Sequence, residues 1–218
     1  MKTFKLEGSP RTELGKKSTK ALRKEGLIPA ILYGFETVEL PYKGKLEKGQ
    51  ILIENQGKGL LNHNFVVSFD AIRKLVYTPE IFLVELTLNG KVHKAILKSL
   101  QTHPVSDEIL HMDFFTVFDD KPIVMDVPVI LEGHSVGVKA GGKLNLVSRK
   151  LRVKALAKDI PEVLRVDVEN LELGKSIQVK MLSFDNLQLI NSPDNVVCSV
   201  VMTRSARSAA ESAASENK

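Results

Sequence analysis

Basic side chains lie close together between residues 11 and 24, and this stretch of the sequence is the one most able to bind a ligand. They are Arg11, Lys16, Lys17, Lys20, Arg23 and Lys24. Ser18 or Thr19 can cap a short helix over residues 20–25, and Gly26 stands where a left-handed residue would end it. The free N–H groups of a helix start attract anions, and the surrounding cations add to this attraction. The pattern predicts a phosphate-binding site, although a solvated charge run is the commoner origin of such a stretch.

A second candidate lies in the sequence HMDFF, residues 111–115. Alternation along a strand would put His111 and Asp113 on one face and turn Met112 and Phe114 into the core. An imidazole can donate a hydrogen bond to a ribose hydroxyl or a base, and a carboxylate can accept one from a guanine amino group. A solvent-exposed pair without a ligand is the alternative.

Tyr33 is a third candidate, because it ends an apolar stretch and is followed by Gly34. An aromatic residue at a strand end belongs more often to a core than to a binding site. Gly34 would nevertheless allow close backbone approach, and the tyrosine could then contact a ribose or a base.

Catalytic chemistry and metal binding are not favoured. His93, His103, His111 and Asp113 could in principle hold a metal, but they lack the helical His-Glu-x-x-His spacing and are separated by loops. The glycine-rich sequence VGVKAGGK is not a phosphate loop, because Leu144 stands where a serine or threonine would be required. We therefore expect no enzymatic activity, no metal and no cofactor.

Charge is unevenly divided along the 218 residues: residues 1–98 hold 17 Lys+Arg and 10 Asp+Glu, a net of +7, and residues 99–218 hold 14 and 16, a net of −2. Only the N-terminal half is therefore expected to meet a polyanion. Cys198 is the single cysteine, so no disulfide can form within the chain, and its apolar surroundings predict burial. The N-terminus lacks an apolar leader and no stretch is apolar enough to span a bilayer, so a cytoplasmic location is expected.

Strand patterns dominate both halves and predict a mainly β fold with minor α content. In residues 1–118, alternating strands, a hairpin at Asn89-Gly90 and two short helices, of which Ser68 can cap the second, predict a small antiparallel β-barrel. Residues 119–203 show short strands at close spacing and predict an antiparallel β domain. Residues 40–62 are rich in glycine and lysine and read as an inserted hairpin or loop, and residues 204–218 read as a disordered tail.

Two ordered motifs resemble bacterial large-subunit ribosomal protein twenty-five. The first is Arg-x-x-x-Gly-Lys, a short basic helix, and then Gly26, Pro29, Ala30, Tyr33 and Gly34. The second is Gln101-Thr102-His103-Pro104, followed by His111-Met112-Asp113-Phe114. The sequence VGVKAGGKL is similar to the C-terminal domain of the longer, TL5-type and general-stress members of that family.

This resemblance implies that the N-terminal domain binds 5S ribosomal RNA in the large subunit. The RNA-contacting residues would be Arg11, Lys16, Thr19, Lys20, Arg23, Tyr33, His111 and Asp113. Ala21 stands where relatives usually have another arginine, which removes one expected contact. The C-terminal domain would meet neighbouring ribosomal proteins or ribosomal RNA, and the chain would be a monomer off the ribosome. A general stress protein that acts partly off the ribosome through protein contacts is the alternative.

Overall fold

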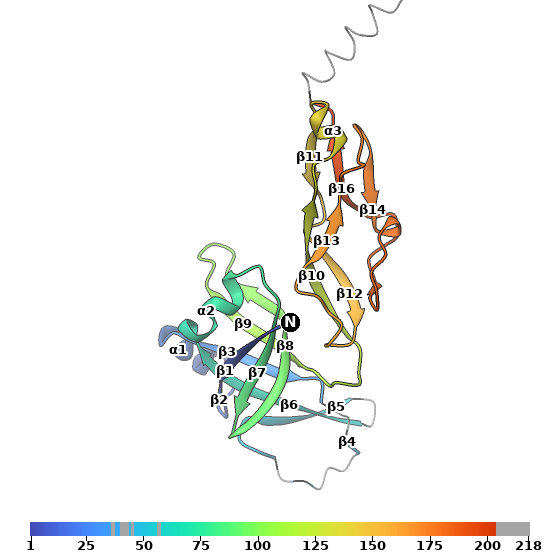
Figure 1. Cartoon of the computed structure of the whole chain (residues 1–218). Helices are drawn as coiled ribbons and strands as arrows, with labels where there is room; N and C mark the ends of the chain where they lie inside the picture. Colours follow the sequence, from blue (N-terminus) through green and yellow to red (C-terminus); the bar gives the residue numbers. More distant parts are fainter. Residues whose placement is uncertain (36–37, 40–43, 45, 56–57, 204–218) are drawn as a thin grey trace, which may run out of the picture. The chain divides into compact units, whose positions relative to one another are not determined.

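The structure is a computed structural model that describes residues 1–35, 38–39, 44, 46–55 and 58–203. It divides between Lys121 and Pro122 into two compact units, and each is described by itself (Figure 1). Strands make up most of the regular structure in both units, so the predicted mainly β fold is confirmed. Within the described part of the chain, no helix combines the length and the apolar character that a membrane crossing requires.

In its described residues, the first unit contains nine strands and two helices. In chain order they are β1 (Lys2–Glu7), β2 (Ser9–Pro10), α1 (Lys16–Lys24), β3 (Leu27–Tyr33), β4 (Val38–Glu39), β5 (Gln50–Asn55), β6 (Lys58–Ser68), α2 (Phe69–Tyr77), β7 (Phe82–Leu88), β8 (Lys91–Thr102) and β9 (Ile109–Thr116).

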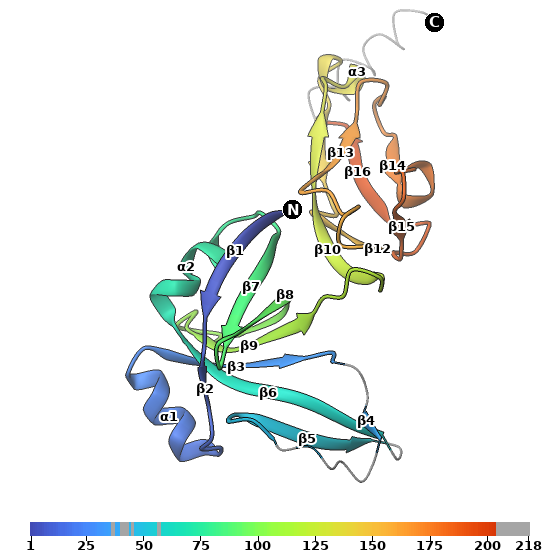
Figure 2. The same ribbon diagram turned by 60° about the horizontal axis from the view of Figure 1, so that its bottom comes forward.

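All strands of this unit belong to one curled sheet with the order β1-β7-β8-β9-β3-β6-β2, and β4 and β5 also pair with β6. The two ends of this order meet in the N-terminal segment, because β1 lies on β7 while β2, directly after Gly8, lies on β6 (Figure 2). The strands are not all antiparallel as expected: β1 pairs with β7, and β3 with β9, in parallel. Parallel partners far apart in sequence leave no local turn signal, which explains the difference.

The core of the first unit lies inside this curl. Leu32, Phe65, Leu86, Met112 and Phe114 are each fully buried there. They are the inward residues of strands whose other side chains face outward, as the period of two requires. The same alternation fixes which face of β9 is available to a ligand.

Two local signals read from the sequence are confirmed. The hydroxyl of Ser68 accepts a hydrogen bond from the N–H of Ala71 and so caps α2. Asn89 and Gly90 form the turn between β7 and β8 with φ values of 50° and 78°. Positive φ at both turn positions matches the right-handed twist of the joined strands.

The predicted insertion forms a hairpin where it is described. β5 pairs along its whole length with β6, from Gln50 opposite His63 to Asn55 opposite Lys58. β6 therefore extends beyond its pairing with β3, and its first half carries the added strand β5 (Figure 2). Residues 40–43, 45 and 56–57 of the insertion, and the expected tail at 204–218, lie outside the described residues.

The second unit is built from short strands and two helical turns. In chain order its elements are β10 (Ile123–Glu132), α3 (Val136–Lys139), β11 (Lys143–Leu146), β12 (Lys150–Ala155), β13 (Leu164–Asp167), β14 (Ser176–Gln178), η1 (Val179–Met181), β15 (Gln188–Leu189) and β16 (Val196–Val201).

Two sheets form this unit, one with the order β13-β10-β12-β15 and one with the order β11-β16-β14. The pair β10–β13 is parallel, again in contrast to the expected antiparallel domain. Val127, Leu151, Val153 and Val197 are fully buried and supply the core. Cys198 is also buried, as predicted, and burial raises the pKa of its thiol.

The sequence VGVKAGGKL forms α3 and the start of β11. Ser135 accepts a hydrogen bond from the N–H of Val138 at 3.1 Å and caps this turn. Gly137 packs so closely that an added Cβ would lie 2.7 Å from the carbonyl carbon of Glu172. These glycines therefore allow close backbone approach as well as turns.

Candidate nucleic-acid interface

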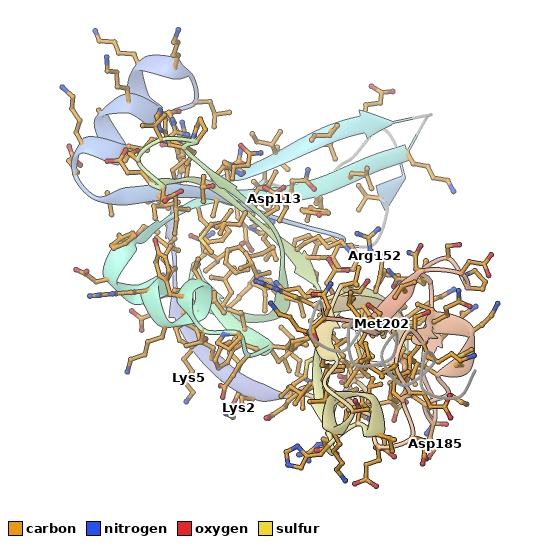
Figure 3. The ribbon with its side chains drawn as sticks, turned by 90° about the horizontal axis from the view of Figure 1, so that it is seen from above. Lys2, Lys5, Asp113, Arg152, Asp185 and Met202 are labelled. Atoms are coloured by element: carbon orange, nitrogen blue, oxygen red, sulfur yellow. The ribbon has the colours of Figure 1, made fainter. Side chains whose placement is uncertain are left out.

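Helix α1 presents a basic surface and buries little of itself against the sheet. None of its residues is fully buried, and its lysines and Arg23 are exposed. The helix begins at Lys16, with Gly15 as N-cap residue at φ 120°, and Gly26 follows its end at φ 74°. The predicted end is confirmed, but the predicted start at Lys20 is wrong, because Ser18 and Thr19 lie inside the helix. Figure 3 shows side chains with nitrogen tips that project from α1 away from the sheet.

Arg11 and Thr19 fix the loop before α1. The guanidinium of Arg11 donates from Nη2 to Oγ1 of Thr19 at 2.8 Å and from Nε to the carbonyl oxygen of Glu13 at 2.9 Å. Thr19 Oγ1 in turn donates to the carbonyl oxygen of Gly15 at 2.7 Å. This bond back to the first turn is why Thr19 does not act as the N-cap. Both residues are thus oriented before any ligand arrives.

Arg23 joins α1 to β9. Its Nε and Nη2 atoms both donate to the carbonyl oxygen of Leu110, at 3.2 and 2.7 Å, across a sequence separation of 87 residues. Leu110 directly precedes His111, so one side chain connects the two motifs that the sequence singled out. Both motifs therefore belong to one surface of the first unit.

His111 and Asp113 face outward from β9, whereas Met112 and Phe114 are fully buried. This confirms the alternation predicted for the strand. His111 Nδ1 lies 2.8 Å from Asp113 Oδ1, and both side chains are partly exposed. An ionised carboxylate only accepts hydrogen bonds, so Nδ1 carries the proton and Nε2 remains for a ligand. Asp113 is labelled in Figure 3.

Tyr33 lies on the neighbouring strand β3, where Ile31 is opposite Asp113 and Tyr33 is opposite Phe115. Its ring meets that of Phe115 edge to face at 5.5 Å. Burial, and to a smaller extent the negative charge of Asp113, raise the pKa of Tyr33. The hydroxyl therefore stays protonated and can donate a hydrogen bond.

Gly34 serves a different purpose from the one expected. Its φ is 94°, and an added Cβ would lie 2.6 Å from the ring of Phe115. The close approach is to a neighbouring aromatic ring within the protein.

Two residues of β8 complete this face, and the sequence reading did not select them. Ser99 lies opposite Asp113 and Gln101 opposite His111 in the strand register, and both are exposed. Gln101 belongs to the motif Gln101-Thr102-His103-Pro104, but only the pairing of β8 with β9 shows that it lies beside His111. The structure thus brings the basic helix, Tyr33, His111 and Asp113 together on one side of the first unit.

The residues weighed as a metal site are dispersed. His103 Nδ1 accepts hydrogen bonds from the N–H groups of Val105 and Ser106 and so closes its own turn. His93 packs at 5.5 Å from His63 and belongs to another part of the sheet. Among the residues that the structure describes, no group of three potential ligands could hold a metal ion.

His63 and His93 form a small aromatic cluster with Phe35. The ring centroids of Phe35 lie 4.9 Å from His63 and 5.5 Å from His93. Burial lowers the pKa of both histidines, and the proximity of His93 lowers that of His63 further. Glu47, which is paired with Lys91, opposes these shifts.

Comparisons with known proteins divide the chain as its structure does. Residues 6–52 and 47–114 match the model of the Ribosomal L25p family, and residues 122–204 match the model described as ribosomal protein TL5, C-terminal domain. The first model matches in two overlapping pieces that meet at the added hairpin.

Curated relatives are similar over almost their entire length. The large ribosomal subunit protein bL25 of Porphyromonas gingivalis is 54% identical over 96% of this chain and 98% of its own. The proteins of the same name from Azobacteroides pseudotrichonymphae and Bacteroides thetaiotaomicron are 51% and 44% identical, over 95% and 98% of this chain and 98% and 99% of theirs.

Proposed function

Because the chain belongs to the Ribosomal L25p family, in a form with a TL5-type C-terminal domain, we propose that its first unit binds 5S ribosomal RNA. The chain is a non-enzymatic protein of the large ribosomal subunit. The choice of 5S RNA rests on the resemblance carried by the two motifs, and the interface would be α1 together with the outer faces of β3 and β9.

The observation that carries this proposal is the bond from Arg23 to Leu110. The two hydrogen bonds from its guanidinium hold the basic helix at a fixed distance from the outer face of β9. A surface fixed before binding loses less conformational entropy when it orders against RNA. A helix of basic residues beside a polar strand face suits an RNA helix, whose phosphates and shallow groove lie close together.

Each residue then has a distinct task. Lys16 and Lys20 are exposed on α1 and neutralise phosphates, which gives affinity without base readout. His111 offers Nε2 to a ribose hydroxyl or base edge, while Asp113 has a second carboxylate oxygen for a guanine amino group. Tyr33 donates its hydroxyl nearby. Arg11 and Thr19 hold the loop and can add contacts at its surface.

The test is a gel-shift titration of the full chain with labelled 5S RNA and with an unrelated RNA of equal length. Lys16→Gln with Lys20→Gln should weaken 5S binding and lower the salt slope by about two, since each lost phosphate contact lowers it by about one. Lys5→Gln with Lys74→Gln removes two exposed lysines from β1 and α2 and should leave 5S binding nearly unchanged. Equal losses in both pairs, or equal affinity for the two RNAs, would argue against a specific interface.

Co-sedimentation with ribosomes separates this proposal from a stress protein that acts off the ribosome. We expect the full chain to sediment with the large subunit during unstressed growth. If the chain is found only in the ribosome-free fraction, the stress-protein alternative would be supported.

A further inference from the structure

Strand β12 and its flanks, in the second unit, carry a second concentration of positive charge. Residues 149–158 contain no acidic residue, and all five of their basic side chains are exposed. They are Arg149, Lys150, Arg152, Lys154 and Lys158. The second half of the chain is nearly neutral as a whole, so this stretch stands out against its surroundings.

The strand geometry sorts three of these cations into one row. Lys150, Arg152 and Lys154 alternate with Leu151, Val153 and Ala155, which are buried in the core of the unit. Successive residues on one face of a strand are about 6.6 to 6.8 Å apart. A row of cations at this spacing can meet phosphates that follow one another along a nucleic-acid strand.

Most of this charge has no partner of its own. Arg152 Nε donates to Asp126 Oδ1 at 3.1 Å on the adjacent strand β10, and its side chain is still 59% exposed. Within the described part of the chain, no carboxylate forms an ion pair with Arg149, Lys150, Lys154 or Lys158. Four cations that form no ion pair with the described residues of the protein favour a polyanion.

We propose that the outer face of β12 is a second RNA-binding surface, which binds the phosphate backbone of ribosomal RNA at a place separate from the first unit's site. This inference rests on the proposed function, because it assumes an RNA-rich assembly around the chain. A row of cations at strand spacing suits a regular polyanion better than a folded protein, whose acidic groups have no such repeat. The surface reads charge and not sequence, since it lacks aromatic side chains for stacking.

The experiment uses the full chain already bound to labelled 5S RNA, to which a short RNA duplex with a second label is added. Formation of a ternary complex is followed at several salt concentrations. In the test variant, Lys150→Gln, Arg152→Gln and Lys154→Gln are combined. The matched control combines Lys139→Gln, Lys143→Gln and Lys175→Gln, which removes the same number of exposed cations from α3, β11 and the turn before β14.

Wild type and control should form the ternary complex, and its affinity should fall about 20- to 40-fold between 50 and 200 mM salt if three phosphates are neutralised. The β12 variant should lose most of the duplex binding while its 5S binding stays unchanged. If the melting temperature of this triple variant drops, the double variant Lys150→Gln with Lys154→Gln is used in its place, because it keeps the Arg152–Asp126 pair.

Three outcomes would overturn the inference. They are equal losses in the β12 and control variants, absence of a ternary complex with the wild type, and loss of large-subunit association by the β12 variant without loss of duplex binding. The last would assign the surface to a protein partner. Failure of the first unit to bind 5S RNA would appear in the signal of the labelled 5S RNA, and failure of the second surface would appear in the signal of the labelled duplex. The two failures are therefore distinguishable.

Discussion

Asp113 gives the sharpest test of the proposed interface, because two physical arguments predict opposite signs for its removal. Its carboxylate receives the Nδ1 hydrogen bond of His111 at 2.8 Å and faces outward from β9. Asp113→Ala removes a negative charge from a surface meant for phosphates. It also removes an acceptor that orients His111 and can bind a base.

The magnitudes separate the two arguments. A carboxylate about 7 Å from a phosphate in water is repelled by roughly 0.6 kcal/mol, so pure electrostatics predicts about threefold tighter binding of the variant. A lost base contact costs about 1 to 3 kcal/mol, which predicts binding weaker by about 5- to 150-fold. The bond to His111 is partly exposed, so the free energy of unfolding should fall by only about 0.5 to 1 kcal/mol. We expect the weaker binding.

Gel-shift titrations at two salt concentrations, with a melting curve for each variant, decide between them. Glu80→Ala is the control, because Glu80 is an exposed acid paired with Lys2 outside the interface. His111→Ala and the double variant complete a cycle, and a coupling of at least about 0.5 kcal/mol would show that the pair acts as a unit. Tighter binding by Asp113→Ala at both salts would refute the reasoning and remove the pair from the interface.

Further predictions concern the core, the helix and pH. Met112→Asp should unfold the first unit in urea titrations, with a loss above about 4 kcal/mol because a charge is buried without a partner, whereas Met112→Leu should cost under about 1.5 kcal/mol. Ala21→Arg adds a guanidinium to an exposed position of α1 and should tighten 5S binding and raise the salt slope by about one, and Ala21→Gln should not. His63 and His93 have pKa values below the ordinary 6.5, so the unfolded chain takes up protons first as the pH falls. The free energy of unfolding should therefore be highest above about pH 6.5 and should fall toward pH 5, and His63→Gln should flatten that slope in urea titrations; a flat profile in the wild type would contradict the burial argument.

Local patterns in the sequence were enough for most elements of the first unit. The alternation around Met112, the cap at Ser68 and the Asn89-Gly90 turn each depend on neighbours within a few residues, and each is found as predicted. The start of α1 was wrong because a helix interior and a cap both accept Thr19. In the structure, Thr19 lies inside the helix, where its hydroxyl donates to the Gly15 carbonyl and accepts a hydrogen bond from Arg11.

Long-range pairing limited the rest. The sequence could nominate Arg23 and His111 separately, but the bond from Arg23 to Leu110 spans 87 residues and depends on how β3 and β9 pair. The positions of Ser99 and Gln101 beside the candidate site follow from the register of β8 with β9, which includes irregularities that no local pattern predicts. The basic row on β12 depends on local sequence alone, because its cations alternate with apolar residues. The nearly neutral net charge of residues 99–218 nevertheless hides it.

The closure of the first unit by its N-terminal segment has a consequence for how the chain folds. β1 pairs in parallel with β7, from Lys2 opposite Phe82 to Glu7 opposite Thr87, so β1 cannot complete its pairing until β7 has been synthesised. Such non-local pairing slows folding, because loop-closure entropy is lost before the contacts form. During synthesis, the basic helix that follows this segment is therefore exposed on an incomplete sheet, before the rest of the proposed RNA interface has formed. A chain stalled before β7 should be a promiscuous and protease-sensitive RNA binder, and selectivity should appear only once β7 to β9 have been made.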